Sequence, residues 1–240
     1  MKPAKLICII ALSLACLPSP AQDKTLTRHD FAYVGEWDTR HPDKQTLYIV
    51  KNGKVDFQFS IPMRDSLGRV QEFDDIRVLP DGNIMFAAMS QLGIINRKGE
   101  YIWKYICPKG TESHSCQPYG KDRVYFALNG VPGKIVIWNT RDNKCEKEII
   151  VPTAGTQTHG QFRHVRLTKE GNFVTGLMFE NKVVELNDKG EIVRSIEGQK
   201  AWHVDKLANG HYLIGGDNKG YVREFDQDGN LVWEVTQKDL

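Results

Sequence analysis

The stretch that decides the fold is His164–Ile196, HVRLTKEGNFVTGLMFENKVVELNDKGEIVRSI. Apolar and polar residues alternate on both sides of Gly171, and the same alternation returns around Gly190. Alternation with a period of two, broken by a polar turn that contains glycine, is the sequence pattern of a β-hairpin. The stretch therefore predicts two successive hairpins, which together make four antiparallel strands.

This pair of hairpins recurs along the chain. The turns of the second hairpin lie at Gly53, Gly99, Asn143, Gly190 and Gly229, spaced 46, 44, 47 and 39 residues apart. The turns of the first hairpin are marked by Gly82, Gly171 and Gly210, and the third repeat lacks this glycine. Four-stranded repeats of about 40–45 residues are typical of the blades of a β-propeller. We predict an all-β propeller with five visible repeats, whose approximate bounds are 24–62, 73–107, 114–151, 162–198 and 201–236.

The two ends of the repeat array do not decide how the ring closes. The segment DKTLTRHD before FAYVGEW is too polar for a good innermost strand, and the sequence ends soon after LVWEV. Propellers close by combining strands from both termini in one blade, which removes free edges. Two alternatives remain: an incomplete six-bladed ring, or a five-bladed ring closed by DKTLTRH. An unclosed ring predicts low stability or dimerisation.

The N-terminus has the pattern of an export signal. Lys2 and Lys5 precede the apolar run Leu6–Leu17, and Ser19-Pro20-Ala21 supplies a small-residue cleavage site. We therefore expect a signal peptide at residues 1–21, a propeller domain at 22–240, and a location in the periplasm or at the cell surface. Cys16 in LSLAC loosely resembles a lipoprotein cleavage box, so a lipid anchor at Cys16 is the alternative to a soluble form.

The charge balance and the cysteine spacing limit the partners and metal sites that the sequence predicts. Removal of Lys2 and Lys5 leaves 30 basic against 30 acidic residues, and no basic cluster predicts binding to nucleic acid. In an oxidising compartment Cys107 and Cys116 can form a disulfide, and reduced, half-buried thiols are the equal alternative. No cysteine pair has the spacing of a structural zinc site, so no metal is expected.

Several segments carry a resemblance to a family. EWDTRHPDKQTLYIV, PKGTESHSCQP, THGQFRHVRLTKEGN and GYVREFDQDGNLVWEV resemble secreted bacterial quinoprotein-like (PQQ-like) β-propeller repeat proteins. The resemblance implies the architecture, a further blade and a closing strand in longer relatives, but no particular activity. The Gly-x-x-x-Trp pairs Gly99–Trp103 and Gly229–Trp233 resemble half of the motif that ties blades together. No calcium-ligating set accompanies them, so neither PQQ nor another cofactor is expected.

Polar residues recur at one equivalent position of successive repeats. Asp75, His164 and His203 each lie seven residues before the first turn glycine, and Ser115, next to His114, is their counterpart in the third repeat. This position begins the innermost strand, so we expect these residues to converge at one mouth of the central channel. The candidate ligand-binding residues are Asp75, His114, Gln117, His159, Arg163, His164, Trp202 and His203.

Several interpretations of this position stay open. In the preferred one the protein is an exported binding module, with Trp202 stacked on a carbohydrate or another small polar ligand. An enzyme that acts on glycans or transfers a group would use His164 or His203 as general acid or base, although no specific catalytic motif is present. A protein-interaction scaffold would use the rim of the blades instead. In the purely structural interpretation the polar residues bind loops and water.

Overall fold

The computed structural model describes residues 29–35, 41–216 and 220–239. The expected signal peptide, Cys16 and most of DKTLTRH lie outside the described residues. Within them the chain forms five antiparallel sheets and two single 3-10 turns, η2 (Thr158–Gly160) and η3 (Gln237–Asp239). None of the helical turns in these ranges is long and apolar enough to cross a membrane. The predicted all-β class is confirmed.

The sheets follow one another along the chain as blades. Blade 1 comprises β1 (Phe31–Tyr33), β2 (Lys44–Lys51) and β3 (Lys54–Pro62). Blade 2 comprises β4 (Phe73–Val78), β5 (Ile84–Ala88), β6 (Gln91–Ile95) and β7 (Tyr101–Ile106). Blade 3 comprises β8 (Cys116–Pro118), β9 (Arg123–Leu128), β10 (Lys134–Asn139) and β11 (Lys144–Ile150). Blade 4 comprises β12 (Val165–Leu167), β13 (Phe173–Leu177), β14 (Lys182–Leu186) and β15 (Ile192–Glu197). Blade 5 comprises β16 (Ala201–Lys206), β17 (Tyr212–Gly216), β18 (Tyr221–Phe225) and β19 (Leu231–Thr236).

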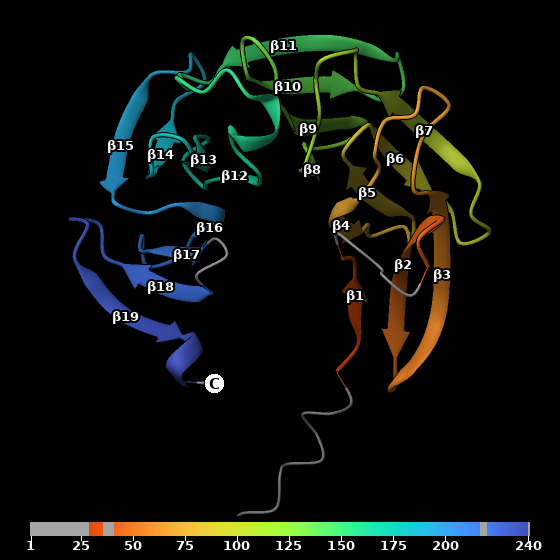
Figure 1. Cartoon of the computed structure of the whole chain (residues 1–240), viewed down its shortest axis with the longest axis horizontal. Helices are drawn as coiled ribbons and strands as arrows, with labels where there is room; N and C mark the ends of the chain where they lie inside the picture. The colour runs from red at the N-terminus through yellow and green to blue at the C-terminus, as the bar shows by residue number, and fades with distance from the viewer. Residues whose placement is uncertain (1–28, 36–40, 217–219, 240) are drawn as a thin grey trace, which may run out of the picture.

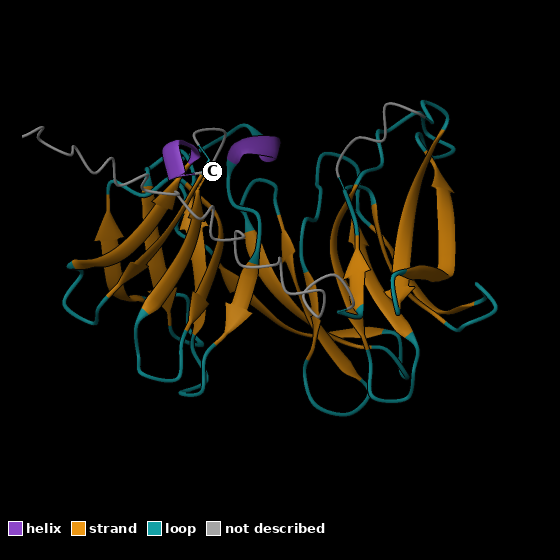
Figure 2. Ribbon diagram, turned by 90° about the horizontal axis from the view of Figure 1, so that it is seen from below, coloured by secondary structure: helices purple, strands orange, loops and turns teal. Residues whose placement is uncertain are grey.

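The blades stand around a common centre, with the first strand of blades 2–5 innermost (Figure 1). Each of these blades is a meander in which sequential strands pair antiparallel, as the hairpin pattern predicts. Gly82, Gly171 and Gly210 have φ angles of 83°, 86° and 85°, a conformation that glycine adopts at little cost. Figure 2 shows the strands running between the two ends of the ring, with the 3-10 turns at one end. The five-bladed propeller is confirmed.

Blade 1 departs from the four-stranded pattern. It contains three strands in the order β1-β2-β3, and β1 has no strand on its inner edge among the described residues. The weak candidate for this strand, DKTLTRH, lies outside the described residues except for its last residue. Figure 1 shows the ring open between β19 of blade 5 and blade 1.

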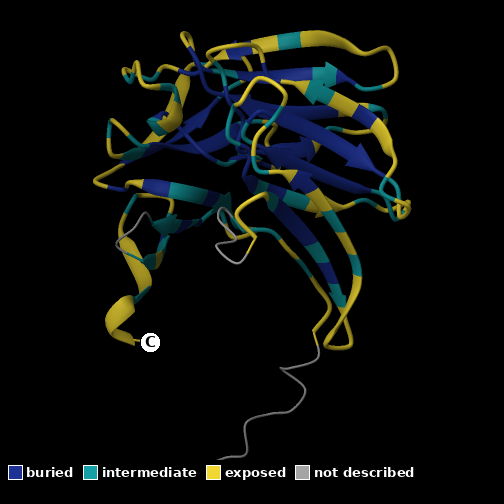
Figure 3. Ribbon diagram, turned by 45° about the vertical axis from the view of Figure 1, so that its right-hand side comes forward, coloured by how far each residue is buried: buried dark blue, intermediate teal, exposed yellow. Residues whose placement is uncertain are grey.

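The core lies between consecutive blades. Four buried apolar clusters join blades 1 and 2, 2 and 3, 3 and 4, and 4 and 5, and together they include Leu47, Phe86, Phe126, Phe173 and Tyr212. Figure 3 shows the inner strands as the buried part of the molecule and the outermost strands as largely exposed. Stability in this architecture therefore comes from the packing of each blade on its neighbour.

The tryptophans of the two Gly-x-x-x-Trp pairs differ in exposure according to whether a neighbouring blade covers them. Trp103 is 6% exposed and belongs to the cluster between blades 2 and 3, as expected for an indole that ties blades together. Trp233 occupies the equivalent place in blade 5 and is 48% exposed. The difference arises because no blade among the described residues packs on that side of blade 5.

Cys107 and Cys116 are free, buried thiols in the cluster between blades 2 and 3. Burial raises the pKa of Cys107 to about 12, so its thiol is protonated at neutral pH. The structure thus describes the reduced alternative rather than the disulfide.

A substitution at Gly176 tests the packing of blade 4 against blade 5. A Cβ at this position would lie 2.4 Å from the backbone oxygen of Ala201, which cannot move without shifting β16. We expect Gly176→Ala to lower the free energy of unfolding by about 1–3 kcal/mol, the usual range for overpacking. Urea unfolding measures the effect.

Gly215→Ala is the matched control, because its Cβ would meet His203 Cβ at 3.5 Å, an ordinary contact. It should be neutral or slightly stabilising, since alanine restricts the unfolded chain. Equal destabilisation by both variants would contradict this account of the interface.

Candidate functional site

The predicted blade position does converge at the centre of the ring. The Nδ1 atoms of His164 and His203 are 2.9 Å apart, and Ser115 Oγ donates to Asp75 Oδ2 over 3.2 Å. These four residues come from four different blades. The alignment of the repeats thus locates correctly a set of residues up to 128 positions apart in sequence.

Asp75 lies in a closed network of hydrogen bonds. It is 6% exposed and accepts bonds from Arg166 Nη1 (3.1 Å), Arg166 Nη2 (3.2 Å) and Gln117 Nε2 (2.8 Å). Gln117 Oε1 in turn accepts from Arg77. Burial alone would raise the pKa of Asp75, but Arg166 above all holds it below its ordinary value. Asp75 and Gln117 therefore join blades 2, 3 and 4, with their polar atoms already occupied by protein groups.

His164 and His203 form a second closed chain of contacts. His164 Nε2 lies 3.0 Å from the carbonyl oxygen of Asp74, which can only accept, so this nitrogen carries the proton. His164 Nδ1 then accepts from His203 Nδ1, and His203 Nε2 donates to Asp205 Oδ2 over 2.7 Å. Burial of the His164 ring lowers its pKa to about 4, which agrees with a neutral ring. The bond from His203 Nε2 lowers the pKa of the Asp205 carboxyl.

The side chains one residue earlier in each blade keep polar atoms that protein groups do not occupy. Asp74, Arg163 and Trp202 each lie eight residues before the turn glycine, and His114 precedes Ser115. Strand pairing is irregular between Phe73 and Asp75 and between Ala201 and His203, so Asp74 and Trp202 lie at β-bulges. A bulge redirects side chains out of the regular alternation. This is why these side chains can turn toward the mouth.

His114 anchors a charged cluster beside them. Its ring is fully buried, with Nδ1 3.1 Å from Asp74 Oδ1 and Nε2 2.9 Å from Glu112 Oε1. Burial disfavours the charged ring, but the attraction of Asp74 and the bond to Glu112 raise the pKa of His114 to about 9. Burial likewise opposes ionisation of Glu112, yet His114 and His159 lower its pKa to about 2. The cluster therefore holds a protonated His114 between two carboxylates.

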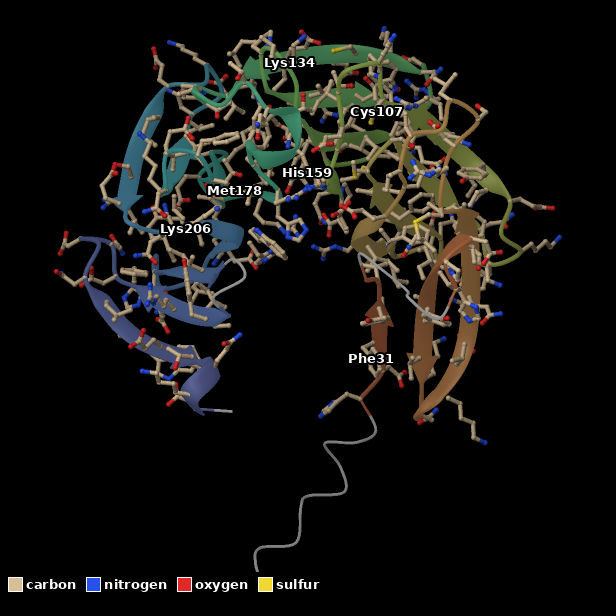
Figure 4. All side chains as sticks on the ribbon, in the orientation of Figure 1. Phe31, Cys107, Lys134, His159, Met178 and Lys206 are labelled. Carbon is tan, nitrogen blue, oxygen red and sulfur yellow. The ribbon has the colours of Figure 1, made fainter. Side chains whose placement is uncertain are left out.

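Arg163 completes this cluster. Its Nη2 donates to His159 Nε2 over 2.8 Å, and its Nη1 lies 2.8 Å from His114 Nδ1. Arg163 and a protonated His114 cannot bond as two donors, and the two carboxylates are the better partners for the ring. We therefore describe Arg163 as packed against the edge of His114. His159, on η2, is exposed and lies on the inner side of blade 4 (Figure 4).

Two groups of side chains here could hold a metal ion by position. They share His114 and are Glu112, His114 and His159, and Glu72, Asp74 and His114. Arg163 already brings a positive charge against both His114 and His159. A divalent cation in the first group would have to displace that charge, so Arg163 disfavours a metal ion between Glu112, His114 and His159.

A small cavity of about 100 Å³ opens at this place. Its walls are Val34, Gly35, Phe73, Asp74, Arg163, His164 and Trp202. Three of these residues carry a buried polar atom with no hydrogen-bond partner among the described residues: Asp74 Oδ2, Arg163 Nε and Trp202 Nε1. Because buried polar groups are nearly always satisfied, the three atoms mark the cavity as a place for a polar group from outside. The cavity thus combines one acceptor with two donors.

Sequence reasoning missed four residues that organise the centre. Arg77, Arg166 and Asp205 lie two residues after the aligned position, where strand alternation returns to the same face. That alternation could have found them. Glu112 lies in the loop before β8, and no repeat signal points to it.

The fold, with a polar centre to which several blades contribute, defines the chain as a β-propeller. No protein-family model and no curated protein matches it. Among solved structures, it is similar to a protein of unknown function from Bacteroides caccae, with 19% identity and a TM-score of 0.72 over 88% of this chain and 74% of that one. It is also similar to a catalytically inactive virginiamycin B lyase from Staphylococcus aureus with quinupristin, with 13% identity and a TM-score of 0.58 over 86% and 74% of the chains.

A streptogramin B lyase structure is similar as well, with 15% identity and a TM-score of 0.53 over 88% of this chain and 74% of that one. At these identities the likeness shows the shared fold. The broader assignment to β-propellers is established, and the narrower resemblance to quinoprotein-like repeat proteins stays a prediction.

Proposed function

We propose that the protein is an exported binding module that holds a carbohydrate or another small hydroxylated ligand in the central cavity. The observation that carries the proposal is the set of three buried atoms without partners, Asp74 Oδ2, Arg163 Nε and Trp202 Nε1. A hydroxyl group both donates and accepts, so neighbouring hydroxyls can satisfy an acceptor and two donors together. Export is supported by the signal pattern of the N-terminus and follows as part of the same proposal.

The polar groups around the cavity suit a hydroxylated ligand. Asp74 and Glu112 contact the protonated His114, and Arg163 packs against the same ring. Glu72 adds a third carboxylate beside Asp74 and His114, so the hydroxyl groups of a ligand meet both acceptors and donors. Trp202 adds an indole, whose face can stack on the apolar side of a sugar ring. At about 100 Å³ the cavity accommodates one end of a ligand rather than a whole oligosaccharide.

The contacts of the histidines support binding over catalysis. Both ring nitrogens of His164 and of His203 are engaged with protein groups. A general base needs a nitrogen within reach of the substrate proton. The enzyme alternative would therefore require the pair to separate first. This proposal involves no cofactor, no nucleic acid and no metal.

A glycan array followed by calorimetry on the full chain tests the proposal. Asp74→Asn keeps an oxygen for His114 and turns the free acceptor into a donor. We expect it to weaken binding of an array-positive glycan roughly tenfold or more, as for a lost buried hydrogen bond. Trp202→Phe, which replaces the indole by a smaller ring without an N–H, should weaken binding several-fold.

Trp233→Phe on the far side of blade 5 is the control and should leave affinity unchanged. Circular dichroism confirms that each variant is folded. Unchanged affinity in folded Asp74→Asn would refute the central site, and an array without a positive glycan would refute a carbohydrate as its ligand.

A further inference from the structure

A second cavity lies on blade 4, away from the one described above. It has a volume of about 350 Å³ and is lined by Ala154, Gly155, Thr156, Gln157, Phe179 and Glu180. The first four residues belong to the loop after β11, and the last two to the turn between β13 and β14. This turn directly follows Met178, which Figure 4 labels on blade 4. The two cavities have no lining residue in common.

Glu180 gives this cavity its charge. It is the one ionisable side chain among the six lining residues. One carboxylate oxygen, Oε1, accepts from the backbone N–H of Ala154. The other, Oε2, is buried and has no hydrogen-bond partner among the described residues. A buried carboxylate oxygen left in this state is costly, and a charged donor is the partner that stabilises it most.

Phe179 supplies an aromatic wall next to this carboxylate. Its side chain is 46% exposed although it is large and apolar. The loop runs close over the ring: a Cβ on Gly155 would lie 1.8 Å from Phe179 Cδ2, and one on Gly160 would lie 2.9 Å from Phe179 Cζ. Only glycine permits this approach, so the ring is fixed between the two glycines while part of it remains open.

A carboxylate beside an open aromatic ring favours an organic cation. The ring presents negative potential on its face and attracts ammonium and guanidinium groups. We propose that the Phe179–Glu180 cavity binds a primary ammonium group on an aliphatic stem, such as a lysine side chain presents. The ammonium donates to Glu180 Oε2 and contacts the open face of Phe179, and the stem lies along the loop. Neutral ligands lack the charge-assisted bond.

The test uses n-butylammonium with the full chain, followed by NMR shifts of the backbone amides. We expect saturable shifts at Gly155, Gln157 and Glu180. 1-Butanol, of the same shape and without charge, should bind at least about tenfold more weakly. Glu180→Gln retains an oxygen for Ala154 and should weaken binding of butylammonium roughly tenfold. Phe179→Leu should weaken it about fivefold, through loss of the cation–π contact.

Asp74→Asn separates this proposal from the function proposed above, because it alters the central cavity and should leave binding of butylammonium unchanged. Unperturbed amide shifts of residues 156–161 in free Glu180→Gln show that the loop keeps its structure, since within residues 153–161 only the Ala154 N–H bonds directly to the substituted side chain. Equal binding of 1-butanol, unchanged binding in Glu180→Gln, or no saturable shift at the loop would each overturn the proposal.

Discussion

Replacing Asp75 with alanine is expected to lower the free energy of unfolding by about 3–5 kcal/mol, the cost of leaving a buried charge without its partner. Asp75 receives two bonds from Arg166 and one from Gln117 at the centre of the ring. Arg166 is largely buried, with its side chain 14% exposed. Without the carboxylate, its guanidinium keeps only the half-exposed Asp205, at 4.0 Å, as a charged partner among the described residues. Urea unfolding at neutral pH measures the loss.

Two further variants make this result specific. Asp142→Ala removes an exposed carboxylate that pairs with Arg141, and it should leave the unfolding midpoint nearly unchanged. The double variant Asp75→Leu/Arg166→Met removes both charges and should recover a large part of the loss, because the desolvation cost disappears with them. If Asp75→Ala unfolds at the same urea concentration as Asp142→Ala, the network does not hold the blades together.

Repeat periodicity determines most of the fold, because each blade repeats one local pattern. The glycines at 82, 171 and 210 mark turns that require positive φ, and all three have it. The same alignment predicts that Asp75, His164 and His203 meet at the centre. It cannot predict that Arg166 satisfies Asp75, since that pairing depends on how three blades pack.

The candidate site was less predictable for a local reason. The bulges at Asp74 and Trp202 interrupt the alternation that the sequence analysis relies on. Sequence reasoning therefore emphasised Asp75, His164 and His203, whose polar contacts are with other protein groups. The atoms without partners belong to Asp74, Arg163 and Trp202, one position earlier in each blade. Arg163 and Trp202 are among the predicted ligand-binding residues, and Asp74 is not.

His114 and His164 should give the stability of the protein opposite dependences on pH. Asp74 and Glu112 raise the pKa of His114 from 6.5 to about 9 despite its burial. Its contribution is therefore complete below about pH 6.5 and is lost as the pH rises through 9. Burial lowers the pKa of His164 from 6.5 to about 4, so its neutral form favours the folded state. That contribution is complete above about pH 6.5 and is lost as the pH falls through 4.

His114 determines how the stability of the protein changes on the alkaline side of neutral pH. A shift from 6.5 to about 9 corresponds to about 3 kcal/mol between pH 6.5 and 9 for this fully buried ring. His114→Asn should therefore cost most at and below about pH 6.5, and its difference from the unmodified chain should shrink as the pH rises toward 9. His211→Asn, at a turn with its partner Glu224, is the control and should follow the unmodified chain. Urea unfolding in steps of pH from 4 to 9.5 gives the three curves. A constant difference in stability between His114→Asn and the unmodified chain across this range would mean that His114 stabilises the centre by packing alone. Only a group whose pKa changes on folding makes this difference depend on pH.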